Sequence, residues 1–354
     1  MNFFLYLWNN LKKLGLIIFL ISAIVTGGWV LYLYDISKKP QPIEKQSIVE
    51  AENALNIGHY TDAERIFEEE LQANPQNQQA VLGLKIAQIR QTLTSPDFKV
   101  AIDALYQQYP TNAYINLFLA EFYSLNNQSD KALLFYEEAI TQNPKLAEAH
   151  NDLALFYEQQ ENFEKAKIES LKAIDLSPIA KYRNNLGAIY FKQQDYEEAI
   201  KEYGRNKEFP LSDLESSKIY WRLEYLSQAS SYQNQAIEWL NDKVVMSKPE
   251  NQEPWQFKII AGTSLTLNSL EEKKNYAYYC LSISLFLQGD RVGADDALKN
   301  INPLSTVQHA GIVALLNADL EALVQSNNSF DHNVAEYKHV YLQNSIHSNQ
   351  EDIQ

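Results

Sequence analysis

The sequence predicts an all-α fold, an α-solenoid of stacked helix pairs preceded by a single N-terminal transmembrane helix. Three observations support this prediction. The 354 residues include only 11 glycines and 11 prolines, about half of what average usage would give, so a β-sandwich or barrel with frequent turns is disfavoured. Prolines recur at a nearly constant interval, and a 21-residue run without charged side chains lies near the N-terminus.

The uncharged run comprises residues 14–34, LGLIIFLISAIVTGGWVLYLY. A helix rises about 1.5 Å per residue, so this run would span about 31 Å and match a hydrocarbon core of about 30 Å. Lysines precede the run, and aromatic side chains, which favour the membrane interface, lie near its end. We therefore predict a short basic and apolar leader (1–13), a signal anchor (14–34) and a linker (35–43).

Two alternatives stay open at this end of the chain. A cleaved signal peptide would leave a soluble exported protein. Its apolar region should be about 7–15 residues long and end at a small-x-small site, whereas this run is longer and its end is bulky. Two lysines precede the run and two follow it, so the basic residues that set orientation are nearly balanced. The short basic leader favours a C-terminal part outside the cytoplasm, with the cytoplasmic orientation as the alternative.

A repeat runs along most of the remaining chain. Pro75, Pro110, Pro144 and Pro178 are separated by 35, 34 and 34 residues. Between them, apolar residues recur at i, i+3, i+4 and i+7, so each interval holds two amphipathic helices. Small residues at matching places let the two helices approach closely: Ala120, Ala154 and Gly187 on the first helix, and Ala132, Ala166 and Ala199 on the second. One unit cannot bury its apolar face alone, so the units must stack.

These units resemble the tetratricopeptide repeat (TPR) family, whose 34-residue unit reads W-x2-L-G-x2-Y, then A-x3-F, A and P. The run Leu186-Gly187-Ala188-Ile189-Tyr190 carries the L-G-x2-Y core. The second unit departs most, because Phe98 stands where the family has alanine. Together with the apolar run, the resemblance implies a membrane-anchored bacterial-type TPR protein, single-pass in a bacterial inner membrane.

The resemblance also sets the predicted domain boundaries. The match is best over residues 113–210 and fades beyond Pro210, with residues 251–269 as a poorly matched insert. The predicted domains are a TPR array of about five units (44–210), degenerate TPR-like helical pairs with a capping helix (211–325) and a polar tail (326–354).

Composition and motifs argue against nucleic-acid binding, metal or cofactor sites and catalysis. A net charge of −15 opposes binding to nucleic acid, which needs a basic surface. Cys280 is the only cysteine, which excludes an intrachain disulfide and multi-thiolate metal sites. The six histidines form no ligand pair, and no phosphate-binding or nucleophile motif is present. We predict no catalytic, cofactor or metal site and no small-molecule substrate, so the chain is not expected to be an enzyme.

The resemblance implies that the first helices of the units line a concave face that holds a protein partner, as an extended or helical segment. The residues on or near that face are Tyr114, Glu121, Asn151, Asp152, Lys181, Asn184 and Asn185. Asn151 and Asn184 recur in adjacent units, and their amides can hydrogen-bond an extended backbone. The alternative is that solvated helix faces simply carry asparagine. The carboxylate clamp of chaperone-binding members is not predicted, because Glu121, Leu155 and Ala188 stand at its asparagine position.

The predicted function is a membrane-tethered TPR scaffold that binds protein partners through its concave face, in the assembly or regulation of a cell-envelope complex. Two alternatives are a non-catalytic arm that presents substrate within an enzyme system, and a soluble exported TPR protein. An arm needs a catalytic body, and the unassigned stretches are too short to hold one.

Overall fold

The computed structural model describes residues 46–93, 95–252, 254–259 and 263–343. The predicted leader, transmembrane helix and linker therefore lie outside the described residues. The chain forms two compact units: one contains Met1–Asn53 and Thr61–Lys85, the other Ala54–Tyr60 and Ile86–Gln354. Each unit is described by itself.

The smaller unit is built from parts of three helices, α2 (Gln46–Asn56), α3 (Tyr60–Ala73) and α4 (Gln78–Gln91). Its buried side chains include Ile48, Ile66 and Phe67 together with alanines such as Ala51 and Ala63. Phe67 is buried, and a Cβ added at Gly83 would lie 2.2 Å from Phe67 Cζ, so the ring packs directly on the glycine backbone.

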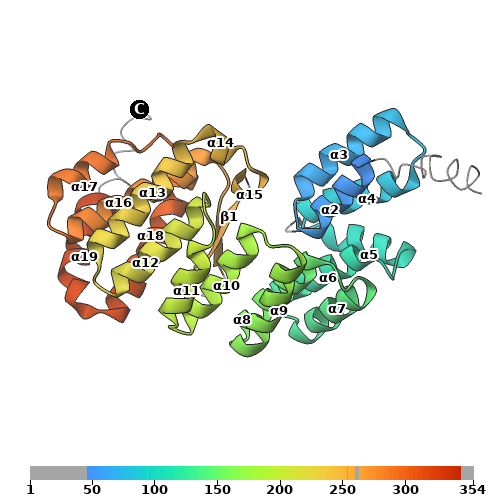
Figure 1. Ribbon diagram of the computed structural model, residues 1–354, viewed down its shortest axis with the longest axis horizontal. Coiled ribbons are helices and arrows are strands. Elements are labelled where there is room, and N and C mark those ends of the chain that lie inside the picture. The colour runs from blue at the N-terminus through green and yellow to red at the C-terminus, as the bar shows by residue number, and fades with distance from the viewer. Residues whose placement is uncertain (1–45, 94, 253, 260–262, 344–354) are drawn as a thin grey trace, which may run out of the picture. The chain divides into compact units, whose positions relative to one another are not determined.

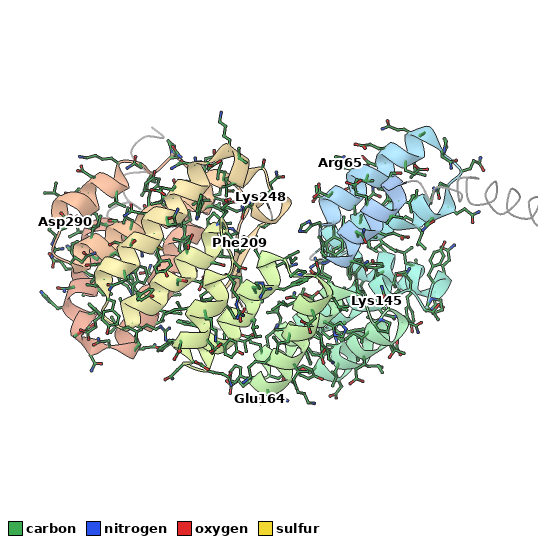
Figure 2. The ribbon with its side chains drawn as sticks, in the orientation of Figure 1. Arg65, Lys145, Glu164, Phe209, Lys248 and Asp290 are labelled. Atoms are coloured by element: carbon green, nitrogen blue, oxygen red, sulfur yellow. The ribbon has the colours of Figure 1, made fainter. Side chains whose placement is uncertain are left out.

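The larger unit is a stack of antiparallel helix pairs (Figure 1). Side chains fill the spaces between neighbouring helices (Figure 2). After α5 (Phe98–Gln108), the pairs are α6 (Ala113–Leu125) with α7 (Ser129–Gln142), α8 (Ala147–Gln159) with α9 (Phe163–Leu176), α10 (Ala180–Lys192) with α11 (Tyr196–Gly204), α12 (Pro210–Arg222) with α13 (Leu226–Asn241), and α16 (Leu270–Leu287) with α17 (Arg291–Leu298). The predicted fold of stacked helix pairs is confirmed.

Close approach within a pair depends on the small residues that the sequence places there. Ala132, Ala166 and Ala199 are fully buried. A Cβ at Gly187 would lie 2.5 Å from Cε1 of Tyr203, so the α10–α11 pair is packed too closely for a side chain at that position.

Each pair in the larger unit turns through one residue in the left-handed backbone region. These residues are Asn127, Glu161, Gln194, Glu224 and Gly289. The N–H of the following residue donates to the carbonyl five residues earlier, as in Gln128 to Tyr123 and Asp290 to Leu285, both 2.9 Å, which is the hydrogen bond of a Schellman turn. Because α12–α13 and α16–α17 share this turn with α6–α11, the weakly matching segment repeats the same structural unit.

Gly289→Ala is expected to lower the free energy of unfolding by about 1 kcal/mol. Its φ is +87° and an added Cβ would meet no atom within 4 Å, so the cost comes from the left-handed backbone alone. Gly204→Ala is the matched control, because Gly204 ends α11, has space for a Cβ and has no positive φ. Urea denaturation of both variants checks this, and equal stability changes would contradict it.

The insert predicted at residues 251–269 contains a β-hairpin within the otherwise helical unit. After the short helices α14 (Lys243–Met246) and α15 (Pro249–Gln252), strands β1 (Trp255–Ile259) and β2 (Thr263–Leu267) pair antiparallel, with Trp255 opposite Leu267. Trp255 and Leu267 are buried at its base. The sequence WQFKI alternates apolar and polar residues, which is the strand pattern.

The C-terminal part differs from the predicted polar tail. After α18 (Thr306–Ser326), η1 (Asn328–Phe330), α19 (Asp331–Tyr337) and η2 (Lys338–Gln343) continue the fold. The prediction was wrong for residues 328–343, because four side chains reach the core: Phe330, Val334, Tyr337 and Leu342. Tyr337 packs edge-to-face on Phe286 with ring centroids 5.2 Å apart. A polar sequence with a few well-spaced apolar residues can therefore still anchor to a stack. Residues 344–354 lie outside the described residues.

Helix α18 packs on α12 and α16. In the part of the chain that the structure describes, it is the one helix long and apolar enough to cross a membrane by length and composition. Its Ile312, Leu316 and Leu320 side chains are buried in the unit, as expected of a helix that belongs to the protein core.

Candidate functional site

The first helices of successive pairs, α6, α8, α10 and α12, contact one another in order (Figure 1). We call the surface that they share the first-helix face. All seven residues predicted to bind a partner lie on α6, α8 or α10. These seven side chains are polar, and they stand at positions where the repeat pattern requires no apolar residue.

The predicted asparagines connect neighbouring first helices. Asn185 Nδ2 donates to Asn151 Oδ1 at 2.8 Å, which links α10 to α8. Ser212 Oγ donates to Asn184 Oδ1 at 3.0 Å, which links α12 to α10. Asn151 and Asn184 are only 1% and 8% exposed. They are not the solvated residues that the sequence suggested, because each side chain lies against the next helix of the stack. Their role toward a partner stays a prediction.

Asn151→Ala is accordingly expected to lower the free energy of unfolding by about 0.5–1.5 kcal/mol, the net value of a typical hydrogen bond. The variant leaves Asn185 Nδ2 without this acceptor. Asn126→Ala is the control, because its amide donates to Phe122 O, on its own helix, and it is exposed. Thermal and urea denaturation check the difference. Equal stability of the two variants would show that the link between α8 and α10 contributes nothing.

Acidic groups gather on the α6–α8 part of the face. Lys181 Nζ pairs with Glu148 Oε1 at 2.7 Å, and the Tyr182 hydroxyl donates to Glu148 Oε2 at 3.0 Å. Asp152 lies near Glu121. Burial raises the pKa of Asp152 well above its usual value, and the nearby Glu148 and Glu121 charges raise it further.

A segment of this chain lies on the same part of the face. We call Ala54–Tyr60 the corner segment. The Tyr114 hydroxyl donates to Asn56 Oδ1 at 2.8 Å. The Tyr60 ring meets Phe118 edge-to-face with centroids 5.5 Å apart. The φ of Gly58 is +77°, and a Cβ there would lie 2.4 Å from Glu148 Oε1, so another residue would strain the backbone and displace this carboxylate. Repeat matching could not show this contact, because it joins elements far apart in sequence.

Arg90, near the end of α4, completes this contact. Its guanidinium lies over the Tyr60 and Phe118 rings, 5.3 and 6.0 Å from their centroids, and pairs with Glu121 at 2.8 Å. Glu121, predicted as a partner-binding residue, is thus buried in an ion pair within the larger unit.

A cavity of about 80 Å³ opens where α10, α12 and α18 meet; its lining residues are Phe191, Glu215, Lys218, Trp221, Arg222, Asp319, Ala322 and Leu323. The Arg222 guanidinium lies 4.5 Å from the Phe191 ring centroid and makes no hydrogen bond or ion pair with the described residues. Its N–H groups are therefore available to an acceptor that enters the cavity.

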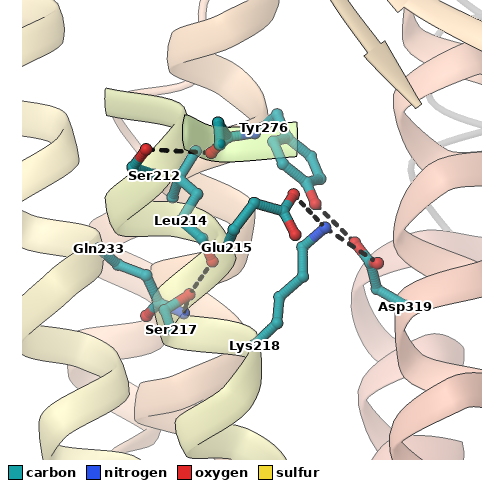
Figure 3. Close-up of polar contacts among 9 residues, drawn as sticks. Ser212, Leu214, Glu215, Ser217, Lys218, Gln233, Tyr276 and Asp319 are labelled. Carbon is teal, nitrogen blue, oxygen red and sulfur yellow. Dashed lines mark hydrogen bonds and ion pairs between the residues drawn. The ribbon is translucent and has the colours of Figure 1, made fainter. Parts of the chain in front are cut away.

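The wall of this cavity is a buried charge network (Figure 3). Lys218 Nζ lies 3.0 Å from Glu215 Oε1 and 3.3 Å from Asp319 Oδ1. The Tyr276 hydroxyl donates to Asp319 Oδ2 at 2.6 Å. Each charge has a partner, so the network fixes α12 against α18. Sequence reasoning missed it, because Asp319 lies about a hundred residues from Lys218 in a helix outside the repeat pattern.

Within the described part of the chain, no group of three or more histidine, cysteine, aspartate or glutamate side chains could hold a metal ion. Cys280 is buried, and burial raises the pKa of its thiol well above the usual value. A thiol held in that state is a poor nucleophile.

A stack of helix pairs with a shared first-helix face defines a helical-repeat scaffold. Two models of the family described as "Tetratricopeptide repeat" match the sequence, one at residues 113–146 and 180–205 and the other at residues 135–168. Over these residues the chain is similar to the tetratricopeptide repeat family. Proteins of this kind are generally non-catalytic scaffolds, and their repeat domains bind peptide or protein partners.

Solved structures are similar to this chain at low sequence identity. The Cut9–Hcn1 hetero-tetramer of the APC/C has a TM-score of 0.51 at 14% identity, over 83% of this chain and 55% of that chain. PilF of Pseudomonas aeruginosa has a TM-score of 0.44 at 15% identity, over 60% and 86% of the two chains. PilW, described as a type IV pilus biogenesis factor, has a TM-score of 0.45 at 16% identity, over 73% of this chain and 98% of that chain. No curated protein sequence matches the chain significantly.

Proposed function

We propose that this protein is a membrane-tethered, non-catalytic scaffold that binds a segment of a partner protein on its first-helix face, in the assembly or regulation of a cell-envelope complex. The supporting observation is the cavity beside Arg222. An arginine held over an aromatic ring, with no acceptor among the described residues, is oriented to donate to a carbonyl or carboxylate of a partner.

Site-specific photocrosslinking tests this proposal. A photoreactive residue at position 192 lies on α10, where the Lys192 side chain is 47% exposed. The control is position 168 on α9, where Ile168 is 53% exposed. Adducts with a distinct protein are expected from position 192 and not from position 168. Equal adducts from both positions would count against binding on the first-helix face.

Arg222→Gln is expected to weaken capture of the crosslinked partner about tenfold, because a hydrogen bond from a charged group is lost. Arg65→Gln makes the same change of charge on an exposed residue of the smaller unit and is expected to leave capture unchanged. Affinity measured with the purified partner separates the two variants. If both lose affinity equally, net charge and not the cavity governs binding.

The tether is proposed from residues 14–34, whose uncharged run matches bilayer thickness, with the repeats outside the cytoplasm. The protein should then stay in the membrane fraction after a carbonate wash. A mature N-terminus found between residues 26 and 39 would instead favour the soluble exported protein.

A further inference from the structure

A row of aromatic side chains lies along the helix pair α12–α13. Tyr220 on α12 stacks on Tyr232 of α13, with ring centroids 5.3 Å apart and ring planes 18° apart. Tyr225, in the turn between the helices, meets Tyr220 edge-to-face at 6.5 Å. Seven residues make about two helical turns, so Trp239 lies on the same side of α13 as Tyr232, and Asp213 on the same side of α12 as Tyr220. We call these five residues the aromatic row.

The aromatic row is open to solvent. Tyr225 is 54% exposed, and the other four side chains are half-buried. The preceding second helix, α11, lies beside α12 (Figure 1) but has only 9 residues, against 14 in α7 and 14 in α9. A Cβ added at its last residue, Gly204, would meet no atom within 4 Å. Asp213 and Arg222 are about two and a half turns of α12 apart, so the row and the Arg222 cavity lie on opposite sides of this helix.

Asp213 is the acid of this row, and it has no cation beside it. It accepts a hydrogen bond from Trp239, but no lysine or arginine among the described residues pairs with it. The other acid of α12, Glu215, pairs with Lys218 at 3.0 Å. Burial raises the pKa of Asp213 to about 7, so the carboxyl group is mostly ionised at pH 8. A half-buried carboxylate without a counter-charge costs stability, and a cation supplied by a partner would remove that cost.

We infer that the aromatic row binds an extended segment of a partner protein through an arginine side chain. The guanidinium pairs with the Asp213 carboxylate beside Trp239, and the apolar stem lies along Tyr232 and Tyr220. Arginine fits because its planar group forms bidentate pairs with carboxylates and stacks on aromatic rings. From Tyr225 to Trp239 the row is about 21 Å long, which is the length of about six extended residues. The inference goes beyond the proposed function, because the row is a second surface for a partner.

The first test titrates the full-length protein at pH 8 with N-acetyl-arginine methylamide and follows the indole N–H signal of Trp239 by NMR, assigned with Trp239→Phe. The control probe is the corresponding citrulline compound, which has nearly the same shape and no charge. The arginine probe should shift the Trp239 signal and bind about tenfold more tightly than the citrulline probe, because a charged hydrogen bond is stronger than a neutral one. Equal binding of the two probes, or no shift with the arginine probe, would overturn the inference.

Variants of the row give the second test. Asp213→Asn should bind the arginine probe only as weakly as the natural sequence binds the citrulline probe. This variant removes a half-buried charge and is expected to fold, so unfolding would not explain the loss. Asp62→Asn makes the same change of charge on an exposed residue of α3 and should bind like the natural sequence. Tyr232→Leu should weaken binding about 2–5-fold, the value of an exposed cation–π contact. An unchanged affinity in the Asp213 or the Tyr232 variant would overturn the inference.

Discussion

Lys218→Met is expected to lower the free energy of unfolding by about 3–5 kcal/mol, the cost of leaving a buried charge unpaired. The Lys218 side chain is 12% exposed, and its ammonium lies between Glu215 and Asp319, which are 17% and 16% exposed. Without the ammonium, two buried carboxylates face each other, with the Tyr276 hydroxyl donating to one of them. Urea denaturation at neutral pH gives the difference from the natural sequence.

Lys299→Met is the matched control. Lys299 pairs with Asp296, but the two side chains are 73% and 60% exposed, and exposed ion pairs of this kind contribute about 0–1 kcal/mol. Adding Asp319→Asn to Lys218→Met should restore part of the lost stability, because it removes one of the two facing carboxylates. If the Lys218 and Lys299 variants lose equal stability, the network in Figure 3 is hydrated and does not hold α12 against α18.

The repeat could be predicted because its spacing and small residues are local and periodic. The turns show the limit of that signal. The left-handed position holds glycine at Gly289 but an ordinary residue at Glu161, Gln194 and Glu224. A search for the family's glycine therefore misses units that the backbone still forms. The hairpin and the C-terminal helices do not follow the repeat spacing. Only the structure, through their buried side chains, shows that they pack on the helix stack.

The candidate site was predictable only as a surface. Helical spacing assigns Asn151 and Asn184 to first helices, but their burial depends on where the next helix stands. Once stacked, each amide meets a side chain of the adjoining unit. The same limit applies to Tyr114 and Glu121, which lie on the face as expected. Asn56 contacts Tyr114 and Arg90 pairs with Glu121, and no single-unit pattern could place those two residues there.

Asp213→Asn is expected to raise the free energy of unfolding by about 2–3 kcal/mol at pH 8 and to change it little at pH 4. Burial raises the pKa of Asp213 to about 7, although a hydrogen bond from Trp239 acts in the opposite direction. An unfolded aspartate has a pKa of about 3.9. Between these two pKa values the folded state holds a proton on Asp213 that the unfolded state has lost. The free energy of unfolding therefore falls as the pH rises from about 4 to about 7.

The size of this effect follows from the shift. Three pKa units correspond to about 4 kcal/mol, and partial exposure of Asp213 reduces that to about 2–3 kcal/mol. Asparagine is neutral at every pH and still offers Trp239 an acceptor, so the variant should lose this part of the pH dependence. Asp62→Asn is the control, because Asp62 is 41% exposed on the surface of α3. Urea denaturation of the natural sequence and both variants at pH 4 and 8 measures the difference. Parallel stability curves for the natural sequence and Asp213→Asn would mean that the carboxylate is solvated, and that α12 carries no buried acid at this position.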